Sequence, residues 1–549
     1  MQESRAVTPD TPHAAQVLPC PPGERLQGRS RRVQPVTARR IPQGRALMRN
    51  TAFSFAQQIG AMALAILLVP YMLWSLGAER YGLWLILQLF NLLGLAYLAE
   101  LGFAGAIVRY LARFHVEGDQ TAFRGLLASG FALFVAIGVT MGAAVIVFAN
   151  TLLPAAFPIA AAYREEMQLA LTVIGFGLMA GFPSLVIKAY FAARQELATT
   201  KIWELCDRVL FALGVFALLH WSTSLVLLVL FEQALALVLT VGFALLASRQ
   251  SGGWFTLAPR LIARGHFRGV AGMSGSVFAT NLVSQGFIRL PELFVGALLG
   301  PVTLTAYQLS TRIPRVIKTL QGSLNAAVMP HIAGLDAAGG AGGTARAEFA
   351  LKGLRANYLL AVPLLLSCAL LAPTLLSLWV GEEYRGLAGY MAGFAGFQAL
   401  FLANNFCNAT LVRQEHFRLF VRVQLAILAA FVAALTFGLE AIGLVFLVAA
   451  MIVAGLAMGL SVLVVFRQVH GLGLARVAGE ALLGPVLISG LAGTVLLGPG
   501  AWLTSERQWL EGAAALTMGG LLYAGVFAVF ILTPPERAAL RGVVRRLRR

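Results

Sequence analysis

Long apolar runs alternate with short polar segments along almost the whole chain. A helix needs roughly 20 mostly apolar residues to cross a bilayer, because each residue adds about 1.5 Å to a path of about 30 Å. About fourteen runs meet this requirement, at residues 50–75, 82–105, 125–149, 168–190, 207–222, 224–247, 269–298, 302–332, 354–379, 387–411, 423–439, 442–466, 479–498 and 511–533. The fifth is short and the eighth weakly apolar, so twelve or thirteen spans are the alternative. The pattern predicts an all-α polytopic membrane protein.

The positions of lysine and arginine predict the orientation of these helices. With the N-terminus in the cytoplasm, the cytoplasmic side carries 34 of the 42 cations and the exterior loops carry four. Cytoplasmic loops of membrane proteins are enriched in Lys and Arg, so we expect an even number of spans and two cytoplasmic termini. The remaining four cations fall inside predicted spans.

Composition supports this assignment and excludes other classes of protein. Apolar residues make up 58% of the 549 and charged residues only 12%, against about 25% charged in soluble domains. An ordinary soluble enzyme, a disordered protein and a coiled coil are therefore excluded. The net charge of +18 marks membrane orientation, so we expect no nucleic-acid partner. Residues 1–45, rich in proline and arginine, indicate a disordered basic cytoplasmic tail, or they precede the true start codon.

An internal repeat is suggested when the chain is shifted by 223 residues. This shift places Leu76-Gly77 on Leu299-Gly300, and in both cases a polar-studded helix precedes a short turn and a second helix. The repeat predicts two six-helix lobes around a central cavity, related by an axis along the membrane normal. The expected units are an N-terminal lobe at 46–267, a C-terminal lobe at 268–478, a helix pair at 479–533 and a basic cytoplasmic tail at 534–549.

Three cations inside the eighth predicted span are the strongest functional signal. Arg312, Arg315 and Lys318 follow one another at three-residue spacing, so they share one face of a helix. Each costs about 2.5–3.5 kcal/mol at the centre of a bilayer, so they must face protein or a water-filled cavity. Arginine suits bidentate contact with phosphate, which predicts an anion-binding cavity wall. The alternative is that they lie at the cytoplasmic interface or pair with acids.

Other polar residues inside predicted spans extend this candidate site. Arg289 and Glu292 lie three residues apart, so they form either a local ion pair or a cavity cation beside a titrating carboxylate. Glu232 is a candidate for ion coupling, with an interhelical hydrogen bond as the alternative. Polar stripes on the first and seventh helices provide candidate cavity-lining amides, at Gln57, Gln58, Asn281 and Gln285.

Several kinds of chemistry are not supported by the sequence. No Walker A, HExxH or GxSxG pattern occurs, so neither ATP-driven transport nor hydrolysis is indicated. The four cysteines form no CxxC pair, and no metal site or other cofactor is expected. Every exterior loop is short, which argues against glycan polymerases and ligases with a large outer domain.

Several segments resemble a known family. Residues 68–84 read L-V-P-Y-M-L-W-S-L-G-A-E-R-Y-G-L-W and are followed by E-L-G-F-A-G-A-I-V-R at 100–109. Residues 298–313 read L-L-G-P-V-T-L-T-A-Y-Q-L-S-T-R-I, and 378–384 read L-W-V-G-E-E-Y. In this order they resemble bacterial polysaccharide-biosynthesis flippases of the O-antigen translocase type. These belong to the multidrug/oligosaccharidyl-lipid/polysaccharide exporter superfamily.

The resemblance implies a function without enzymatic catalysis. It implies alternating-access transfer of a polyprenyl-pyrophosphate-linked oligosaccharide across the bacterial inner membrane, for lipopolysaccharide or exopolysaccharide assembly. Arg312 lies in a matching motif, so a role in the cavity carries over to it most directly. The implied partners are the lipid-linked glycan, membrane lipids and the glycan polymerase and glycosyltransferases of the pathway. The alternatives are a cation-coupled multidrug exporter, the lipid II flippase branch, and a membrane glycan ligase or polymerase.

Overall fold

The computed structural model describes residues 43–92, 94, 103–250, 279, 282–337, 342–411, 417–470, 473–483 and 486–487. Contacts divide the chain into residues 1–48 and residues 49–549, and all packing described below lies within the second unit. Residues 1–42 of the predicted N-terminal tail, the predicted C-terminal tail, the fourteenth predicted span and Asn281 lie outside the described residues, whereas residues 43–45, also assigned to the tail, are helical.

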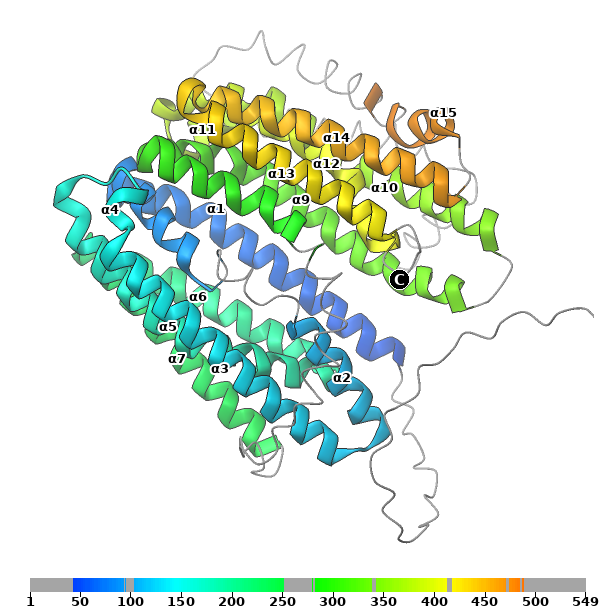
Figure 1. The fold of residues 1–549 in the computed structure, drawn as a ribbon, viewed down its shortest axis with the longest axis horizontal. Coiled ribbons are helices and arrows are strands. Elements are labelled where there is room, and N and C mark those ends of the chain that lie inside the picture. Colours follow the sequence, from blue (N-terminus) through cyan, green and yellow to red (C-terminus); the bar gives the residue numbers. More distant parts are fainter. Residues whose placement is uncertain are drawn as a thin grey trace, which may run out of the picture. The chain divides into compact units, whose positions relative to one another are not determined.

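The first half of the described chain is a series of helices packed around α5. Their bounds are α1 Gln43–Phe90, α2 Phe103–Glu117, α3 Gln120–Thr151, α4 Leu153–Ala156, α5 Ala161–Ala193, α6 Leu197–Trp221 and α7 Leu225–Gln250. Helix α5 contacts α2, α3, α6 and α7. Figure 1 shows α3, α5 and α7 running side by side.

The second half is a similar series packed around α12. Residues 282–294 are helical and continue into η3 Val295–Leu299, α9 Gly300–Ala337, α10 Gly342–Leu370, α11 Ala372–Val380, η4 Glu382–Leu387, α12 Ala388–Leu411, α13 Phe417–Ile442, α14 Leu444–His470, α15 Leu474–Val477 and η5 Ala478–Leu483. Helix α12 contacts α9, α10 and α14.

The prediction of an all-α membrane protein is confirmed. Within the described ranges every regular element is a helix, and nine helical stretches are long and apolar enough to cross a bilayer. Two of these stretches, Gly60–Phe90 and Leu282–Thr319, each combine parts of two predicted spans. In each stretch, one glycine interrupts the helix between the two spans.

Gly77 and Gly300 make these interruptions with nearly the same backbone conformation. Gly77 has φ 75° and ψ 167°, and Gly300 has φ 85° and ψ 176°. Only glycine adopts this region without strain, because a Cβ atom would crowd the backbone. The chain can therefore pass from one span to the next at a single residue, and it does so twice, 223 residues apart.

Four long helices of the first half recur in the second half with a similar spacing. The first residues of α3 and α10 are 222 positions apart, those of α5 and α12 are 227 apart, those of α6 and α13 are 220 apart, and those of α7 and α14 are 219 apart. Together with the two glycines, these offsets show that the repeat is one of backbone structure and not only of a few letters.

Residues 106–124 separate two predicted spans, and a helix that does not span the membrane, α2 (Phe103–Glu117), occupies most of this interval. Apolar side chains on one face of α2, including Ile107 and Leu111, are buried against the neighbouring helices, whereas Arg109 is exposed. Such a stripe gives an amphipathic helix. Fifteen residues extend only about 22 Å, so a search for membrane-spanning runs does not detect this helix.

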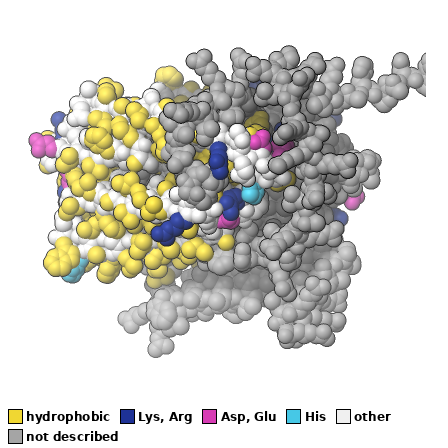
Figure 2. Space-filling model, turned by 90° about the horizontal axis from the view of Figure 1, so that it is seen from below, with side chains coloured by type: hydrophobic (Ala, Val, Ile, Leu, Met, Phe, Trp, Pro, Cys, Tyr) yellow, Lys and Arg dark blue, Asp and Glu magenta, His cyan; other side chains and the backbone are white. Residues whose placement is uncertain are grey.

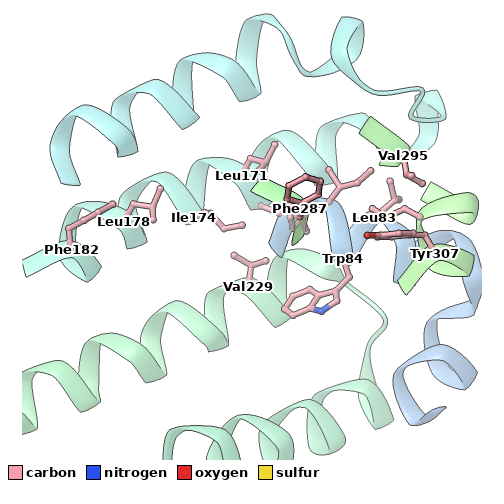
Figure 3. Close-up of a cluster of buried hydrophobic side chains, with 14 of the residues drawn as sticks. Leu83, Trp84, Leu171, Ile174, Leu178, Phe182, Val229, Phe287, Val295 and Tyr307 are labelled. Carbon is pink, nitrogen blue, oxygen red and sulfur yellow. The ribbon is translucent and has the colours of Figure 1, made fainter. Parts of the chain in front are cut away.

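A continuous apolar core joins the helices of both halves. It includes Leu171 of α5, Val229 of α7, Leu83 of α1 and Tyr307 of α9, and Figure 3 shows these side chains gathered between their helices. The exterior is also apolar. In Figure 2 hydrophobic side chains cover much of the described part of the visible face, as expected where lipid replaces water as the solvent.

The conformation of the two glycines can be tested through stability. Replacing Gly77 or Gly300 by alanine should lower the free energy of unfolding by about 1–3 kcal/mol, because alanine is strained in this backbone conformation. At Gly77 a methyl group would meet no atom within 4 Å, so the loss there would be conformational and not steric. Thermal unfolding of the detergent-purified protein measures it.

The control for this experiment is Gly389→Ala in α12. A methyl group at Gly389 also meets no atom within 4 Å, and its φ lies outside the positive region. We expect an unchanged or slightly higher melting temperature, because alanine favours a helix by about 1 kcal/mol. Equal melting temperatures for Gly77→Ala, Gly389→Ala and the parent protein would contradict the assigned backbone conformation.

Candidate functional site

Helix α9 places three cations along a part of its length that fits inside a bilayer. Arg312, Arg315 and Lys318 follow the first residue of the helix by 12, 15 and 18 positions, or about 18, 22 and 27 Å along the axis. If Gly300 lies at one membrane boundary, Arg312 and Arg315 fall within the hydrocarbon and Lys318 near its far edge, since that layer is about 30 Å thick.

Glu292 joins Arg315 to Arg289 in a three-residue cluster whose carboxylate is buried. The Glu292 side chain is only 1% exposed, and its Oε1 lies 2.5 Å from Arg315 Nη1 while its Oε2 lies 3.1 Å from Arg289 Nη1. Each carboxylate oxygen thus accepts a charge-assisted hydrogen bond. Of the two predicted arrangements for Arg289 and Glu292, the local ion pair is present, and Arg315 from the next helix joins it.

Aromatic rings contact two of the cationic side chains of α9, those of Arg315 and Lys318. Arg315 donates from Nη2 to the hydroxyl oxygen of Tyr307 at 2.9 Å, and its guanidinium carbon lies 5.4 Å from the centroid of that ring. The Lys318 ammonium lies 5.0 Å from the centroid of Phe401 in α12. Cation–π contacts of this kind partly offset the loss of hydration of a cation.

Arg315 and Lys318 line one small cavity in the second half of the protein. The other lining residues are mainly aromatic or apolar: Phe287, Ile288, Tyr307, Thr311, Phe394, Phe397, Gln398, Phe401 and Met451. Its free volume is about 10 Å³, which is room for about one water molecule. In this conformation the cavity would have to widen before a phosphate-containing ligand could enter it.

The side-chain oxygen of Gln398, another residue that lines this cavity, has no hydrogen-bond partner in the described part of the chain. The Gln398 side chain is 94% buried. A buried amide oxygen without a partner costs free energy, so this position favours a ligand or water that donates a hydrogen bond. Sequence analysis missed Gln398, because one glutamine in an apolar helix gives no signal of where it points.

Arg312 does not share the cavity wall with Arg315 and Lys318. Its side chain is half-buried and, within the part of the chain that the structure describes, has no ion-pair or hydrogen-bond partner. The prediction of one face with three cations is therefore met by two of them in this conformation. Among the described residues, pairing with an acid, which was one alternative, is seen for Arg315 and not for Arg312 or Lys318.

Glu232 lies in a separate cluster in the first half of the protein. It accepts hydrogen bonds from Gln88 Nε2 at 2.8 Å and from Asn91 Nδ2 at 2.9 Å. No lysine or arginine lies within ion-pair distance of it among the described residues. The interhelical hydrogen bond, one of its two predicted roles, is present, since Glu232 is in α7 and Gln88 is in α1.

The candidate amides outside these clusters do not line the cavity. Gln57 and Gln58 are half-buried residues of α1, and Gln285 is half-buried in the helix that leads to η3. None of the three is among the residues around Arg315 and Lys318. Their assignment to a cavity wall stays a prediction.

At the shift that aligns Gly77 with Gly300, the positions of the cationic cluster are occupied by apolar residues in the first half of the chain. A shift of 223 residues pairs Arg289 with Ile66, Glu292 with Val69, Arg312 with Leu89 and Arg315 with Leu92. All four partners are apolar, although the two glycines that anchor the repeat have the same conformation. One copy of the fold therefore packs with apolar residues where the other holds a carboxylate and three arginines, which favours a functional role for the charges.

Comparisons with known proteins give a family and a fold. The family model described as polysaccharide biosynthesis protein matches residues 76–389. The chain is similar to the lipid II flippase MurJ in an inward closed conformation, with 12% identity and a TM-score of 0.67 over 87% of this chain and 98% of that one. It is also similar to the eukaryotic MATE transporter AtDTX14, with 11% identity and a TM-score of 0.53 over 80% of this chain and 98% of that one.

A third solved structure with this fold is a multidrug resistance MATE family transporter of the MOP superfamily in an outward-facing conformation. The identity is 13% and the TM-score 0.53, over 79% of this chain and 96% of that one. No curated protein sequence matches the chain. At such low identities the structural likeness shows a shared fold.

The different surroundings of Arg315 and Arg312 predict different effects on stability. Arg315→Ala removes hydrogen bonds to Glu292 and Tyr307, so it should lower the free energy of unfolding by about 1–3 kcal/mol. Arg312→Ala removes no such bond and should leave the melting temperature almost unchanged. Thermal unfolding of the two purified variants compares them directly, and an equal loss in both would contradict the assigned contacts.

Proposed function

Since this chain belongs to the polysaccharide biosynthesis protein family, we propose that it moves a polyprenyl-pyrophosphate-linked oligosaccharide across the cytoplasmic membrane by alternating access. Its family and fold are those of flippases and transporters and not of enzymes. The observation that carries the proposal is the cavity lined by Arg315 and Lys318, with Glu292 and Arg289 beside it. The pyrophosphate of the carrier lipid is the anion that this site would bind.

The aromatic and apolar lining of the cavity supports an amphipathic substrate. A lipid-linked glycan carries a charged pyrophosphate between a hydrocarbon chain and a polar sugar. Cations next to Phe287, Phe397 and Phe401 offer charge beside apolar surface. Walls of low polarity strengthen the charge-assisted contacts that arginine makes with phosphate.

Contacts between the two halves support the alternating-access part of the proposal. A side chain at Gly82 would overlap the backbone of Pro301, and Thr305 Oγ1 donates to the Ala78 carbonyl oxygen at 2.7 Å. The orientation derived from Lys and Arg assigns these positions to the outer side of the membrane. The two repeats, which we take as lobes 46–267 and 268–478, would thus be in contact at the outer side in this state, as alternating access requires of one of its two states.

We further propose a location and partners for this activity. Both termini would lie in the cytoplasm of a bacterial cell, with the protein in its inner membrane. The glycosyltransferases that build the lipid-linked glycan would act on the cytoplasmic side. A glycan polymerase would receive it on the other side, for lipopolysaccharide or exopolysaccharide assembly.

One observation favours a cation-coupled multidrug exporter as the second candidate. Glu232 is a carboxylate within a membrane-spanning helix, held by two amides and by no cation among the described residues. An intramembrane carboxylate in that setting suits a coupling ion or proton. For such an exporter, Glu232→Gln would abolish drug efflux, whereas replacement of the α9 cations would matter less.

The test of the proposed function is a triple variant in cells that make a surface glycan. Arg312, Arg315 and Lys318 replaced together by alanine should abolish export and leave the lipid-linked glycan in the inner leaflet, because the phosphate-binding charge is lost. The control is Arg385→Ala, which removes a 61%-exposed arginine paired with Glu382. Normal glycan export by the triple variant, at equal protein levels in the membrane, would contradict the proposal.

Contact between the halves gives a second prediction. Gly82→Leu should hold the outer side open, because the larger side chain cannot fit against the Pro301 backbone. Export should fall at least tenfold, and a cysteine placed at Thr305, which is 1% exposed, should react faster with a membrane-impermeant maleimide. Gly389→Leu serves as the control, and unchanged labelling in Gly82→Leu would count against closure at this point.

A further inference from the structure

We propose that Glu292 is an internal counterion that holds Arg315 until the phosphate of the substrate displaces it, an inference that rests on the proposed function. Glu292 would then be a positioning residue that sets how tightly the anion is bound and how readily it leaves. The contact that the exchange would break, between Glu292 and Arg315, is present in the structure.

The first argument is that Arg315 has its terminal nitrogens engaged in this conformation. Its Nη1 bonds Glu292 at 2.5 Å, and its Nη2 bonds the Tyr307 hydroxyl at 2.9 Å. A bidentate contact with phosphate uses a pair of guanidinium N–H donors. Phosphate can therefore gain this contact only as Arg315 gives up at least one of its present partners.

The second argument is the size of the cavity that Arg315 lines. Its free volume is about 10 Å³, so a phosphate group cannot enter without movement of the walls. Arg315 lies on α9, while Glu292 lies on the preceding helix. A widening of the cavity between these helices would lengthen the Arg315–Glu292 contact as it makes room for the anion.

The third argument is that Glu292 keeps a partner after the exchange. Arg289, three residues before it on the same helix, bonds the other carboxylate oxygen at 3.1 Å. The carboxylate is therefore not left as an uncompensated buried charge, a state that would be strongly unfavourable. Before exchange one carboxylate serves two arginines, and after it each arginine has its own anion.

The fourth argument is that packing alone does not demand a carboxylate at this position. The repeat pairs Glu292 with Val69, and the residues on either side of Val69 are Leu68 and Pro70. A shift of one residue in the alignment would therefore still place an apolar residue there. A carboxylate buried to 1% exposure in one copy of the fold only has a use beyond filling space.

Binding of inorganic pyrophosphate to the purified full-length protein in nanodiscs tests the exchange. Glu292→Gln keeps the shape of the side chain and removes the competing charge, so the Kd should fall at least tenfold. Export in cells should fall as well, because the bound anion leaves more slowly. A mainly structural role predicts the opposite for affinity, since disruption of the site would weaken binding.

Three further variants keep the result decisive. Arg289→Gln combined with Glu292→Gln preserves the net charge of the cluster and should also bind pyrophosphate more tightly, even if the single variant is unstable. Glu382→Gln removes a carboxylate from an exposed i,i+3 pair and should leave the Kd unchanged. Arg315→Ala should weaken binding at least tenfold.

The outcomes separate the inference from the proposed function. If the parent protein binds pyrophosphate and both Glu292 variants bind it no more tightly, the counterion role is wrong while the anion site stands. If neither the parent protein nor any Glu292 variant binds pyrophosphate, the anion site itself is wrong and the inference falls with it.

Discussion

A charge inside a membrane needs a partner, and this constraint explains most of what surrounds α9. Glu292 and Tyr307 bond Arg315, and Phe401 lies beside the Lys318 ammonium. Each contact replaces part of the hydration that the cation would have in water. The Glu292 carboxylate contacts Arg289 as well as Arg315, so it is not the partner of Arg315 alone. The protein thus tolerates the cations while keeping their attraction for another anion.

The repeat explains how such a site could arise without a new fold. Gly77 and Gly300 turn the chain in the same way, and helix boundaries recur with similar spacing in the two halves. The contents differ: the first half places Gln88 and Asn91 around Glu232, while the second places arginines around Glu292. The two halves have similar backbones, but the polar cluster of the first half is built from amides and that of the second half from arginines. The two halves therefore differ in the charge of these clusters.

Much of the fold could be predicted from the sequence, because the cost of placing polar groups in lipid leaves a simple apolar pattern. The turns at Gly77 and Gly300 were visible as paired Leu-Gly dipeptides. Helix α2 was not visible in the sequence pattern, because it is too short to cross a bilayer and buries only one face against its neighbours. Pattern alone gives the length of an apolar run but not the partner of an amphipathic one.

The candidate site was predictable as a set of charges and not as an arrangement. Spacing along one helix put Arg312, Arg315 and Lys318 on one face, but only contacts between helices show which of them meet Glu292 and which line the cavity. Gln398 and Phe401 lie more than 80 positions from Arg315 in the sequence. No local pattern could place them at the same cavity.

The backbone contact between Gly82 and Pro301 has a consequence for leakage. Protons and small ions cross membranes along files of water molecules, and such a file needs space and hydrogen-bonding groups. At this contact there is no room for even one added methyl group, and proline offers no N–H. If the protein moves a large polar cargo, as we propose, a contact this tight would leave no space for a file of water molecules between these two residues and would limit leakage of ions there.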